Sequence, residues 1–277
     1  MSNKRGLGIV IFVFIFSLFL LGCQTEASAI VEPPAKTAEI VEEIVVMSTP
    51  TEVPATPTPI VPTPTPEPDG FLIEDFDNEE SGLWPYFVVD GSNSVIAREE
   101  IGENASIKEG YYQFKLTQSW QWAYAIFDAF EYEDVRIDVS VENRGTNNNG
   151  ISLICRYSEF DGWYEFNIAN NGLYYIYYAA PRFDGFVNYT ELADGGSNAI
   201  KQGKDINDYT AICEDKTLTL MINGNLEREI LIPVNLTYLK KGKIGISASS
   251  FGSTPVEVAF DWVKISHPRN KANTTDQ

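Results

Sequence analysis

Apolar and polar residues alternate with a period of two over much of the chain between residues 71 and 265. One face of the segment 134–141 carries only Val and Ile side chains, at Val135, Ile137, Val139 and Val141. Such alternation predicts half-buried β-strands, and it recurs in the segments 163–168, 216–222 and 256–265. Turn signals separate these strands at 161–162, 170–172 and 223–224. No long segment has helical periodicity, so we predict an all-β sandwich of two antiparallel sheets, of the jelly-roll type.

The N-terminus has the organisation of a secretory signal. Lys4-Arg5 forms a basic head, and an apolar run follows it and ends at Leu20-Leu21-Gly22-Cys23. This last motif resembles the bacterial lipobox, in which the Cys is lipidated and becomes the new N-terminus. An uncleaved transmembrane anchor is the alternative, but the run of about 15 residues is shorter than the roughly 20 that span a bilayer. We predict a signal peptide over 1–22, a lipid on Cys23, and a membrane-anchored lipoprotein at the bacterial cell surface.

A segment rich in Pro and Thr follows the predicted anchor. Ten of the 15 prolines lie between Pro33 and Pro68. Frequent Pro favours an extended polyproline II chain, and this composition buries too little apolar surface to fold. We predict a disordered tether over 23–69, one jelly-roll domain over 70–268, and a disordered tail over 269–277.

The net charge of the chain is strongly negative, at -19. An acidic surface repels nucleic acid, anionic lipid and acidic polysaccharides, and it keeps an exported protein soluble. We therefore expect no nucleic-acid partner. The expected partner is a neutral glycan or an extracellular protein, bound by a monomer that attaches to the membrane through its lipid.

Two cysteines, Cys155 and Cys213, remain once Cys23 is assigned to the lipid. Both lie in predicted strands, and an exported location permits oxidation. A disulfide between them closes a loop of about 58 residues, which stabilises the fold by roughly 4 kcal/mol in the chain-entropy description. Two buried free thiols, packing as small apolar side chains, are the alternative. We predict the disulfide.

Several motifs between residues 70 and 268 resemble the concanavalin A-like lectin and glucanase superfamily. They include Glu-Asp-Phe-Asp at 74–77, Trp-Tyr-Glu-Phe-Asn-Ile at 163–168, Leu-Thr-Leu-Met-Ile-Asn-Gly at 218–224, and Val-Ala-Phe-Asp-Trp-Val at 258–263. The superfamily includes laminin-G-like modules, and the chain is similar to bacterial surface lipoproteins that carry such a domain. The resemblance implies a concanavalin A-like jelly roll. It leaves the function open, because lectins, hydrolases and inert modules share this fold.

In such a jelly roll, one sheet has a concave face that often binds glycans. If Ile151, Leu153 and Cys155 face the core, strand alternation turns the next residues of this strand towards the groove. The candidate ligand-binding residues are then Arg156, Trp163, Glu165, Asn167, Tyr175 and Tyr177, with Tyr174 and Tyr178 as the alternative pair of tyrosines. Aromatic rings pack against sugar faces, and Arg, Glu and Asn side chains bind sugar hydroxyls. The alternative is ordinary cross-strand packing with an ion pair between Arg156 and Glu165.

A glycoside hydrolase is the enzyme alternative, since it needs two carboxylates about 5–9 Å apart around the scissile bond. Glu159, Asp161 and Glu165 approximate the Glu-x-Asp-x-x-Glu strand of laminarinase-like hydrolases, but with one residue too many. Asp161-Gly162 also predicts a turn, so alternation does not place all three carboxylates on one face. We predict a non-catalytic domain that binds a glycan or another extracellular ligand. A structural or protein-interaction module is the third possibility.

Calcium is the one metal that the sequence suggests. Asp75, Asp77 and Asp261 lie on the first and last predicted strands, where the chain ends meet, and oxygen ligands suit this ion. Exposed charges at strand edges are the alternative. The single histidine, His267, lies at the domain edge, so we expect no Ser-His-Asp triad and no His-rich metal site. No other cofactor is expected.

Overall fold

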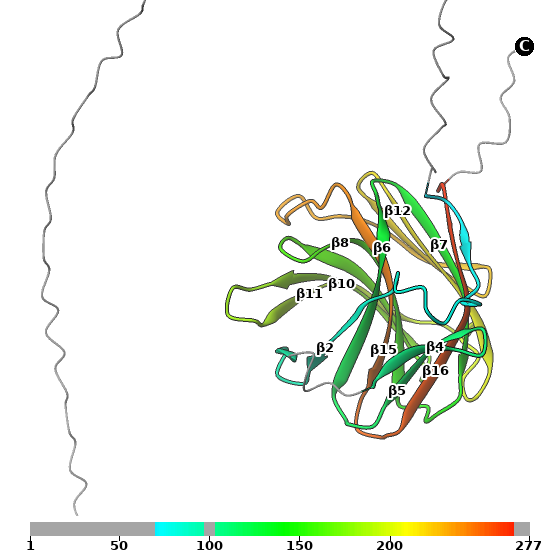
Figure 1. Cartoon of the computed structure of the whole chain (residues 1–277). Helices are drawn as coiled ribbons and strands as arrows, with labels where there is room; N and C mark the ends of the chain where they lie inside the picture. The colour runs from blue at the N-terminus through cyan, green and yellow to red at the C-terminus, as the bar shows by residue number, and fades with distance from the viewer. Residues whose placement is uncertain (1–69, 97–102, 269–277) are drawn as a thin grey trace, which may run out of the picture. The chain divides into compact units, whose positions relative to one another are not determined.

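The computed structural model describes residues 70–96 and 103–268 (Figure 1). These residues form two antiparallel sheets packed face to face, with no helix in the described ranges. The predicted all-β sandwich is therefore confirmed. Accordingly, this part of the chain has no helix with the length and apolar character needed to cross a membrane. The predicted signal peptide, lipid on Cys23, tether and tail (1–69 and 269–277) lie outside the described residues.

The back sheet runs in the order β14-β13-β12-β7-β16-β5-β4, with β1 paired to β16. Its strands are β1 (Ile73–Glu74), β4 (Ala105–Lys108), β5 (Tyr111–Leu116), β7 (Val135–Asn143), β12 (Ile206–Glu214), β13 (Thr217–Ile222), β14 (Asn225–Leu231) and β16 (Val256–Ser266). The first and last described strands thus lie side by side, as the sequence predicted for the chain ends.

The concave sheet runs in the order β11-β10-β9-β8-β15-β6-β2-β3. It curls so that β10 and β11 bend over its outer face on the same side as β2 (Figure 1). Its strands are β2 (Tyr86–Asp90), β3 (Val95–Ile96), β6 (Gln121–Tyr132), β8 (Asn149–Ser158), β9 (Gly162–Ala169), β10 (Leu173–Pro181), β11 (Val187–Gly196) and β15 (Gly242–Ser250).

The main core lies between the two sheets. The face predicted for β7 is buried there, with Val135, Ile137, Val139 and Val141 at most 1% exposed. Burial of one such side chain contributes about 1.5–3 kcal/mol relative to exposure. The disulfide between Cys155 on β8 and Cys213 on β12 joins the sheets inside this core, which confirms the predicted pair.

A second apolar cluster covers part of the concave face, on the side of the sheet away from the main core. Its buried members are Val89, Tyr124, Ile126, Ile154, Trp163, Ala179 and Val187. All eight residues of β9 are consequently buried, on both faces of the strand. The sheet therefore presents only the rest of its concave face to solvent.

Candidate functional site

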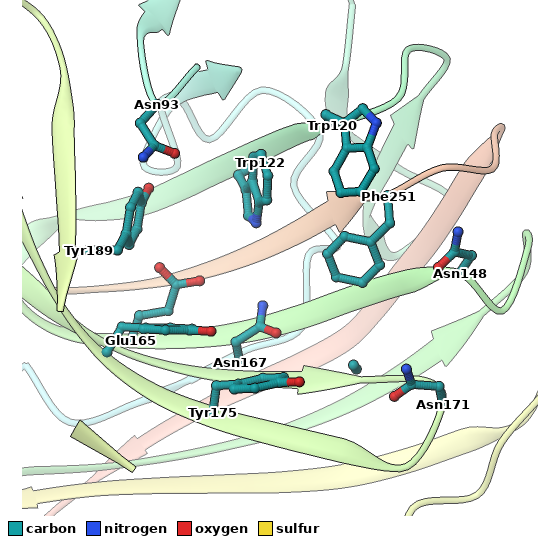
Figure 2. A pocket seen from close by; sticks show the side chains of 12 residues that line it. Asn93, Trp120, Trp122, Asn148, Glu165, Asn167, Asn171, Tyr175, Tyr189 and Phe251 are labelled. Carbon is teal, nitrogen blue, oxygen red and sulfur yellow. The ribbon is translucent and has the colours of Figure 1, made fainter. Parts of the chain in front are cut away.

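The open part of the concave face forms a cavity of about 560 Å³, within the roughly 300–1,000 Å³ typical of small-ligand pockets. Six of its lining side chains are aromatic and four are amides, and Glu165 and Ala169 complete the lining; Figure 2 shows most of these side chains. These ten residues are Trp120, Trp122, Tyr175, Tyr177, Tyr189, Phe251, Asn93, Asn148, Asn167 and Asn171. The lining is therefore aromatic and polar but nearly free of charge.

Aromatic side chains form two walls that face each other. On β10 the rings of Tyr175 and Tyr177 lie nearly parallel, at an interplanar angle of 13° and a centroid distance of 5.8 Å. Trp120 and Trp122 lie opposite Tyr175, beside Phe251 (Figure 2). Trp120 is 54% exposed, so its ring is available at the rim of the cavity.

Small residues lie on two neighbouring central strands of the same sheet, β8 and β15. Gly150 and Ser152 of β8 pair with Ser249 and Ser247 of β15. A Cβ atom on Gly150 would lie 2.6 Å from Oγ of Ser249, too close for a real contact, and 3.0 Å from Nδ2 of Asn167, which would have to shift. The hydroxyls of Ser247 and Ser249 are buried and have no hydrogen-bond partner among the described residues.

Glu165 on β9 is the one carboxylate among the described residues that line the cavity, and it is only 2% exposed. Its Oε1 accepts a hydrogen bond from the Ser152 hydroxyl at 2.7 Å. Its Oε2 accepts from the Tyr124 hydroxyl at 3.0 Å and from the indole N–H of Trp163 at 3.3 Å. Both carboxylate oxygens are thus already engaged within the protein.

Burial controls the ionisation of this region. Desolvation raises the pKa of Glu165 above its usual 4.5, although the hydrogen bonds it accepts oppose the shift. The hydroxyls of Tyr124 and Tyr189 lie 2.9 Å apart, and burial raises the pKa of both tyrosines well above 10. These tyrosines therefore stay neutral, and Glu165 is the one carboxylate among the described residues of the lining whose ionisation burial disfavours.

Four of the six predicted ligand-binding residues line the cavity: Glu165, Asn167, Tyr175 and Tyr177. The alternative tyrosines, Tyr174 and Tyr178, face the main core. Trp163 is 2% exposed and belongs to the second apolar cluster. Its ring lines a separate cavity of about 420 Å³, so it supports the candidate site indirectly, through its hydrogen bond to Glu165 and its ring contact with Tyr189.

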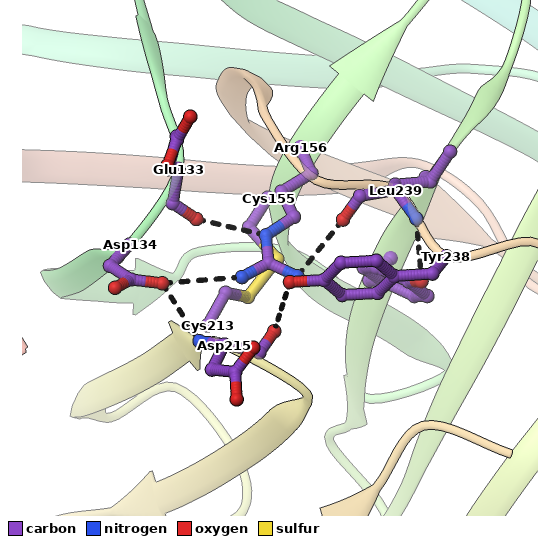
Figure 3. Close-up of a disulfide and its surroundings, with 9 residues drawn as sticks. Glu133, Asp134, Cys155, Arg156, Cys213, Asp215, Tyr238 and Leu239 are labelled. Atoms are coloured by element: carbon purple, nitrogen blue, oxygen red, sulfur yellow. Dashed lines mark hydrogen bonds and ion pairs between the residues drawn. A yellow bond between two sulfur atoms is a disulfide. The ribbon is translucent and has the colours of Figure 1, made fainter. Parts of the chain in front are cut away.

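The predicted position of Arg156 in the groove is wrong. The pairing of β8 with β9 shifts register between Cys155 and Ser158, and Arg156 has a positive φ of 54°. This bulge breaks the strict alternation on which the prediction depended. The Arg156 side chain therefore leaves the concave face and lies beside the disulfide (Figure 3).

In that position the guanidinium of Arg156 is fully buried and has its own partners. It donates hydrogen bonds to the carbonyl oxygens of Glu133 and Leu239, each at 2.9 Å. It also reaches the Asp134 carboxylate at 3.4 Å (Figure 3). The ion pair with Glu165 that was the alternative expectation does not form, because Arg156 pairs with Asp134 instead.

Four aromatic residues of the cavity were missed by the sequence reasoning: Trp120, Trp122, Tyr189 and Phe251. Trp122 and Tyr124 are two residues apart on β6. Residues at this spacing share a face of the sheet, so the sequence did carry a sign that Trp122 lies on the same face as Tyr124. Phe251 lies just beyond the end of β15, and Trp120 lies before β6 with a positive φ of 60°. No local pattern indicates that these two residues face the β9–β10 hairpin.

The other carboxylates that the sequence singled out lie away from the cavity. Glu159 and Asp161 are exposed in the turn between β8 and β9, where the Asp161 carboxylate accepts a hydrogen bond from the Ser158 hydroxyl at 2.9 Å. The turn predicted at 161–162 is thus present, and the three carboxylates considered for hydrolysis do not share one face.

The calcium prediction has no support from a carboxylate cluster. Over residues 70–96 and 103–268, no group of three or more His, Cys, Asp or Glu side chains is placed to hold a metal ion. Asp75, Asp77 and Asp261 are exposed and do not form such a group. A calcium requirement as such stays a prediction.

No protein-family model matches the sequence, and no curated protein matches it. The fold, however, is similar to solved glucanases. One of them is a family 16 glycoside hydrolase from a mixed-linkage glucan locus of Bacteroides ovatus, solved with its G4G4G3G product. Its TM-score is 0.52 at 11% sequence identity, and the match covers 70% of this chain and 99% of that one. The β-glucanase of Bacillus licheniformis has a TM-score of 0.50 at 16% identity, covering 71% and 98%.

The domain has a jelly-roll fold similar to that of these glucanases. A family 16 endo-glucanase from Bacteroides ovatus, with a TM-score of 0.53 at 10% identity and coverage of 70% and 99%, has the same architecture. At such identities the similarity establishes the fold alone, so the function of this jelly roll has to be argued from its own side chains.

Proposed function

We propose that the jelly roll binds a neutral glycan in the 560 Å³ cavity without catalysis. The observation that carries the proposal is the lining, in which aromatic rings and amides surround one buried carboxylate. Sugar rings pack their C–H faces on aromatic side chains, and their hydroxyls bind amides. The solved glucanases of the same fold are a precedent for glycan recognition by this architecture.

The aromatic and amide groups are already held in place. The nearly parallel rings of Tyr175 and Tyr177 provide a surface on which a sugar can pack, with Trp122 on the opposite wall. Asn167 donates to the Ser152 hydroxyl at 2.9 Å, which fixes the orientation of its amide. Such preorganisation reduces the entropy cost of binding.

The carboxylates favour binding over hydrolysis. A glycosidase requires one carboxyl group as acid and a second as nucleophile or base, about 5–9 Å apart. Glu165 has both oxygens engaged by neighbouring donors. No second carboxylate is found among the described residues that line the cavity. Hydrolysis within this cavity is therefore the less supported alternative.

The proposal extends to where the domain works. We infer that the chain is exported, that a lipid on Cys23 anchors it at the bacterial surface, and that the Pro/Thr-rich segment spaces the domain from the membrane. A polyproline II chain rises about 3.1 Å per residue, so a tether of this length gives a reach on the order of 100 Å. A monomer with this reach can bind glycans outside the membrane to which it is attached.

A protein-interaction module is the second candidate. The observation in its favour is that side chains of the sheet itself, centred on Trp163 and Tyr124, fill part of the concave face. A surface closed in this way presents less of a groove to a glycan. The open cavity beside it still makes glycan binding the better-supported function.

A glycan array with the full-length protein tests the proposal, with calcium present and absent. We expect binding to neutral glycans and a dissociation constant raised roughly 3- to 10-fold in Trp122→Ala and in Tyr175→Ala, since an aromatic contact contributes about 0.5–1.5 kcal/mol. Phe160→Ala is the matched control, because Phe160 is 83% exposed in the β8–β9 turn, outside the cavity.

Three results would contradict the proposal. Failure to bind any neutral glycan would favour a protein as the partner of this domain. Binding that neither cavity variant weakens would place the ligand elsewhere on the domain. Release of shorter oligosaccharides from a bound glycan, detected by mass spectrometry, would show that the domain hydrolyses its ligand.

A further inference from the structure

The cavity has one closed end, because the two edges of the concave sheet meet above it. Ser94, directly before β3, and Phe186, directly before β11, form an antiparallel bridge. Backbone hydrogen bonds of 2.9 and 2.8 Å flank this pair, from Val95 N to Gly185 O and from Val187 N to Asn93 O. The sheet therefore closes on itself at this point instead of leaving a groove open from side to side.

Each of the two turns that form the bridge is held by its own side chains. In the turn after β2, Oδ1 of Asp90 accepts hydrogen bonds from the backbone N–H groups of Ser92 and Ser94, at 2.8 and 3.1 Å. In the facing turn, Arg182 and Asp184 form an ion pair at 2.5 Å. The bridge thus joins two ordered turns.

Aromatic rings fill the space beneath the bridge. Trp163 packs at centroid distances of 5.5–6.3 Å against four rings, those of Phe87, Tyr124, Tyr157 and Tyr189. Tyr124 from β6 and Tyr189 from β11 also meet through their hydroxyls at 2.9 Å. The bridge and these rings separate the candidate site from the 420 Å³ cavity on the other part of the concave face.

We propose that the candidate site receives the end of a glycan chain and not an internal segment. The inference rests on the proposed function and specifies its ligand. Asn93, Tyr189 and Glu165 lie at one end of the cavity, while Trp120 and Phe251 lie towards the other (Figure 2). A polymer bound through an internal segment must extend out of the cavity at both of the cavity's ends. The bridge closes the end of the cavity near Asn93.

The closed end also offers groups that distinguish a terminal sugar. The Asn93 amide and the Tyr189 hydroxyl both line the cavity there. A terminal sugar has a free hydroxyl at the position where an internal sugar has its glycosidic bond. A site built to hydrogen-bond such a hydroxyl rejects ligands that lack it, because its own polar groups are then left unpaired.

The first experiment counts binding sites on polymers. The probes are mixed-linkage β-glucan, β-1,3-glucan, xylan, mannan and levan, each intact and after partial acid hydrolysis, at equal mass and with the full-length protein. For a polymer that the protein binds, we expect the moles of protein bound per gram to rise in proportion to the number of chain ends. Capacity that stays constant per gram after hydrolysis would overturn end recognition and leave glycan binding intact.

The second experiment locks the bridge. Ser94 and Phe186 are directly opposed and lie outside the lining of the candidate site. A disulfide in Ser94→Cys/Phe186→Cys therefore leaves that site unchanged. We expect the oxidised variant to bind the hydrolysed probe with a dissociation constant within about twofold of the wild-type value. A loss of about tenfold or more on oxidation, about 1.4 kcal/mol, that reduction reverses would show that the chain passes beneath the bridge.

The wild-type protein, treated with the same oxidant and reductant, is the control for both states. Glycan binding and end recognition are contradicted by different results. If the wild-type protein binds none of the five polymers in either form, the proposed function fails, and end recognition fails with it. If it binds them in proportion to mass, only end recognition fails.

Discussion

Trp163 donates its indole N–H to Oε2 of Glu165, two residues along the same strand, at 3.3 Å. Residues two apart in a strand face the same side, so this bond links the aromatic cluster to the carboxylate of the cavity. The hydroxyls of Ser152 and Tyr124 donate to the same carboxylate. Glu165 thus acts as the common acceptor for three buried donors at the closed end of the cavity.

Removal of this acceptor is expected to destabilise the fold. In Glu165→Ala three buried donors lose their partner, and each unsatisfied group costs about 1–3 kcal/mol. We expect the free energy of unfolding to fall by roughly 3–5 kcal/mol in urea denaturation. Glu165→Gln keeps an acceptor oxygen and most of the volume, so it should lose only about 1–2 kcal/mol. Equal losses in the two variants would contradict this role.

The raised pKa of Glu165 predicts a pH dependence of stability. The folded protein holds this proton more tightly than the unfolded chain, whose pKa is near 4.5. The stabilisation is therefore fully present below that value and is lost as the pH rises through the folded pKa. We expect the unfolding free energy of the wild type, relative to Glu165→Gln, to be lower at about pH 7 than at about pH 4.

Urea denaturation of both proteins at the two pH values measures this difference. The other carboxylates titrate in both proteins, so their contributions cancel in the comparison. A difference that stays constant, or that favours the wild type more at neutral pH, would show that the pKa of Glu165 is not raised.

Arg156 is expected to act on stability and not on ligand binding. Arg156→Met leaves the carbonyl oxygens of Glu133 and Leu239 and the Asp134 carboxylate without their buried donor. The Asp134 carboxylate is about half exposed, so the loss comes mainly from the two carbonyl oxygens, and we expect the free energy of unfolding to fall by about 1–3 kcal/mol. Arg228→Met on exposed β14 is the control and should change stability by less than about 0.5 kcal/mol. A folded Arg156→Met protein that no longer bound a glycan would place the guanidinium at the ligand after all.

The disulfide between the sheets is expected to contribute strongly to stability. The Cys155→Ser/Cys213→Ser double variant should lose about 4 kcal/mol of unfolding free energy, as expected when a loop of this length is no longer closed. Urea denaturation of this variant and of the wild type, each with and without reductant, measures the loss. Reductant should lower the stability of the wild type alone. An equal effect on the variant would show that the bond is not the source of the difference.

Four of the twelve residues that line the cavity were among those the sequence proposed. Glu165 and Asn167 are two residues apart on β9, and the turn at 170–172 brings Tyr177 and Tyr175 directly opposite them. A tight turn sets the register of a hairpin, and the register sets which side chains share a face. Alternation predicted that Glu165 and Asn167 share a face, but it left open whether Tyr175 and Tyr177 or Tyr174 and Tyr178 join them. The register of the hairpin decided for Tyr175 and Tyr177.

Arg156 shows where local reasoning failed. Its strand alternates regularly up to Cys155, and the sequence has no Gly or Asn at 156 to indicate a positive φ. One bulged residue reverses the face of the side chain that follows. The bulge depends on partners in distant segments, at Glu133 and Leu239, which no local pattern reveals.

The sequence by itself determined the all-β class, several strands and tight turns, the disulfide pair and the shared face of Glu165 and Asn167, because each depends on periodicity, turn chemistry or a small set of cysteines. Only the tertiary structure decided the opposite wall with Trp122 and the buried position of Trp163. It also decided the closed end at Ser94 and Phe186. These features depend on which distant strands become neighbours and on how far the sheet curls, and the curl accumulates over all of its strands.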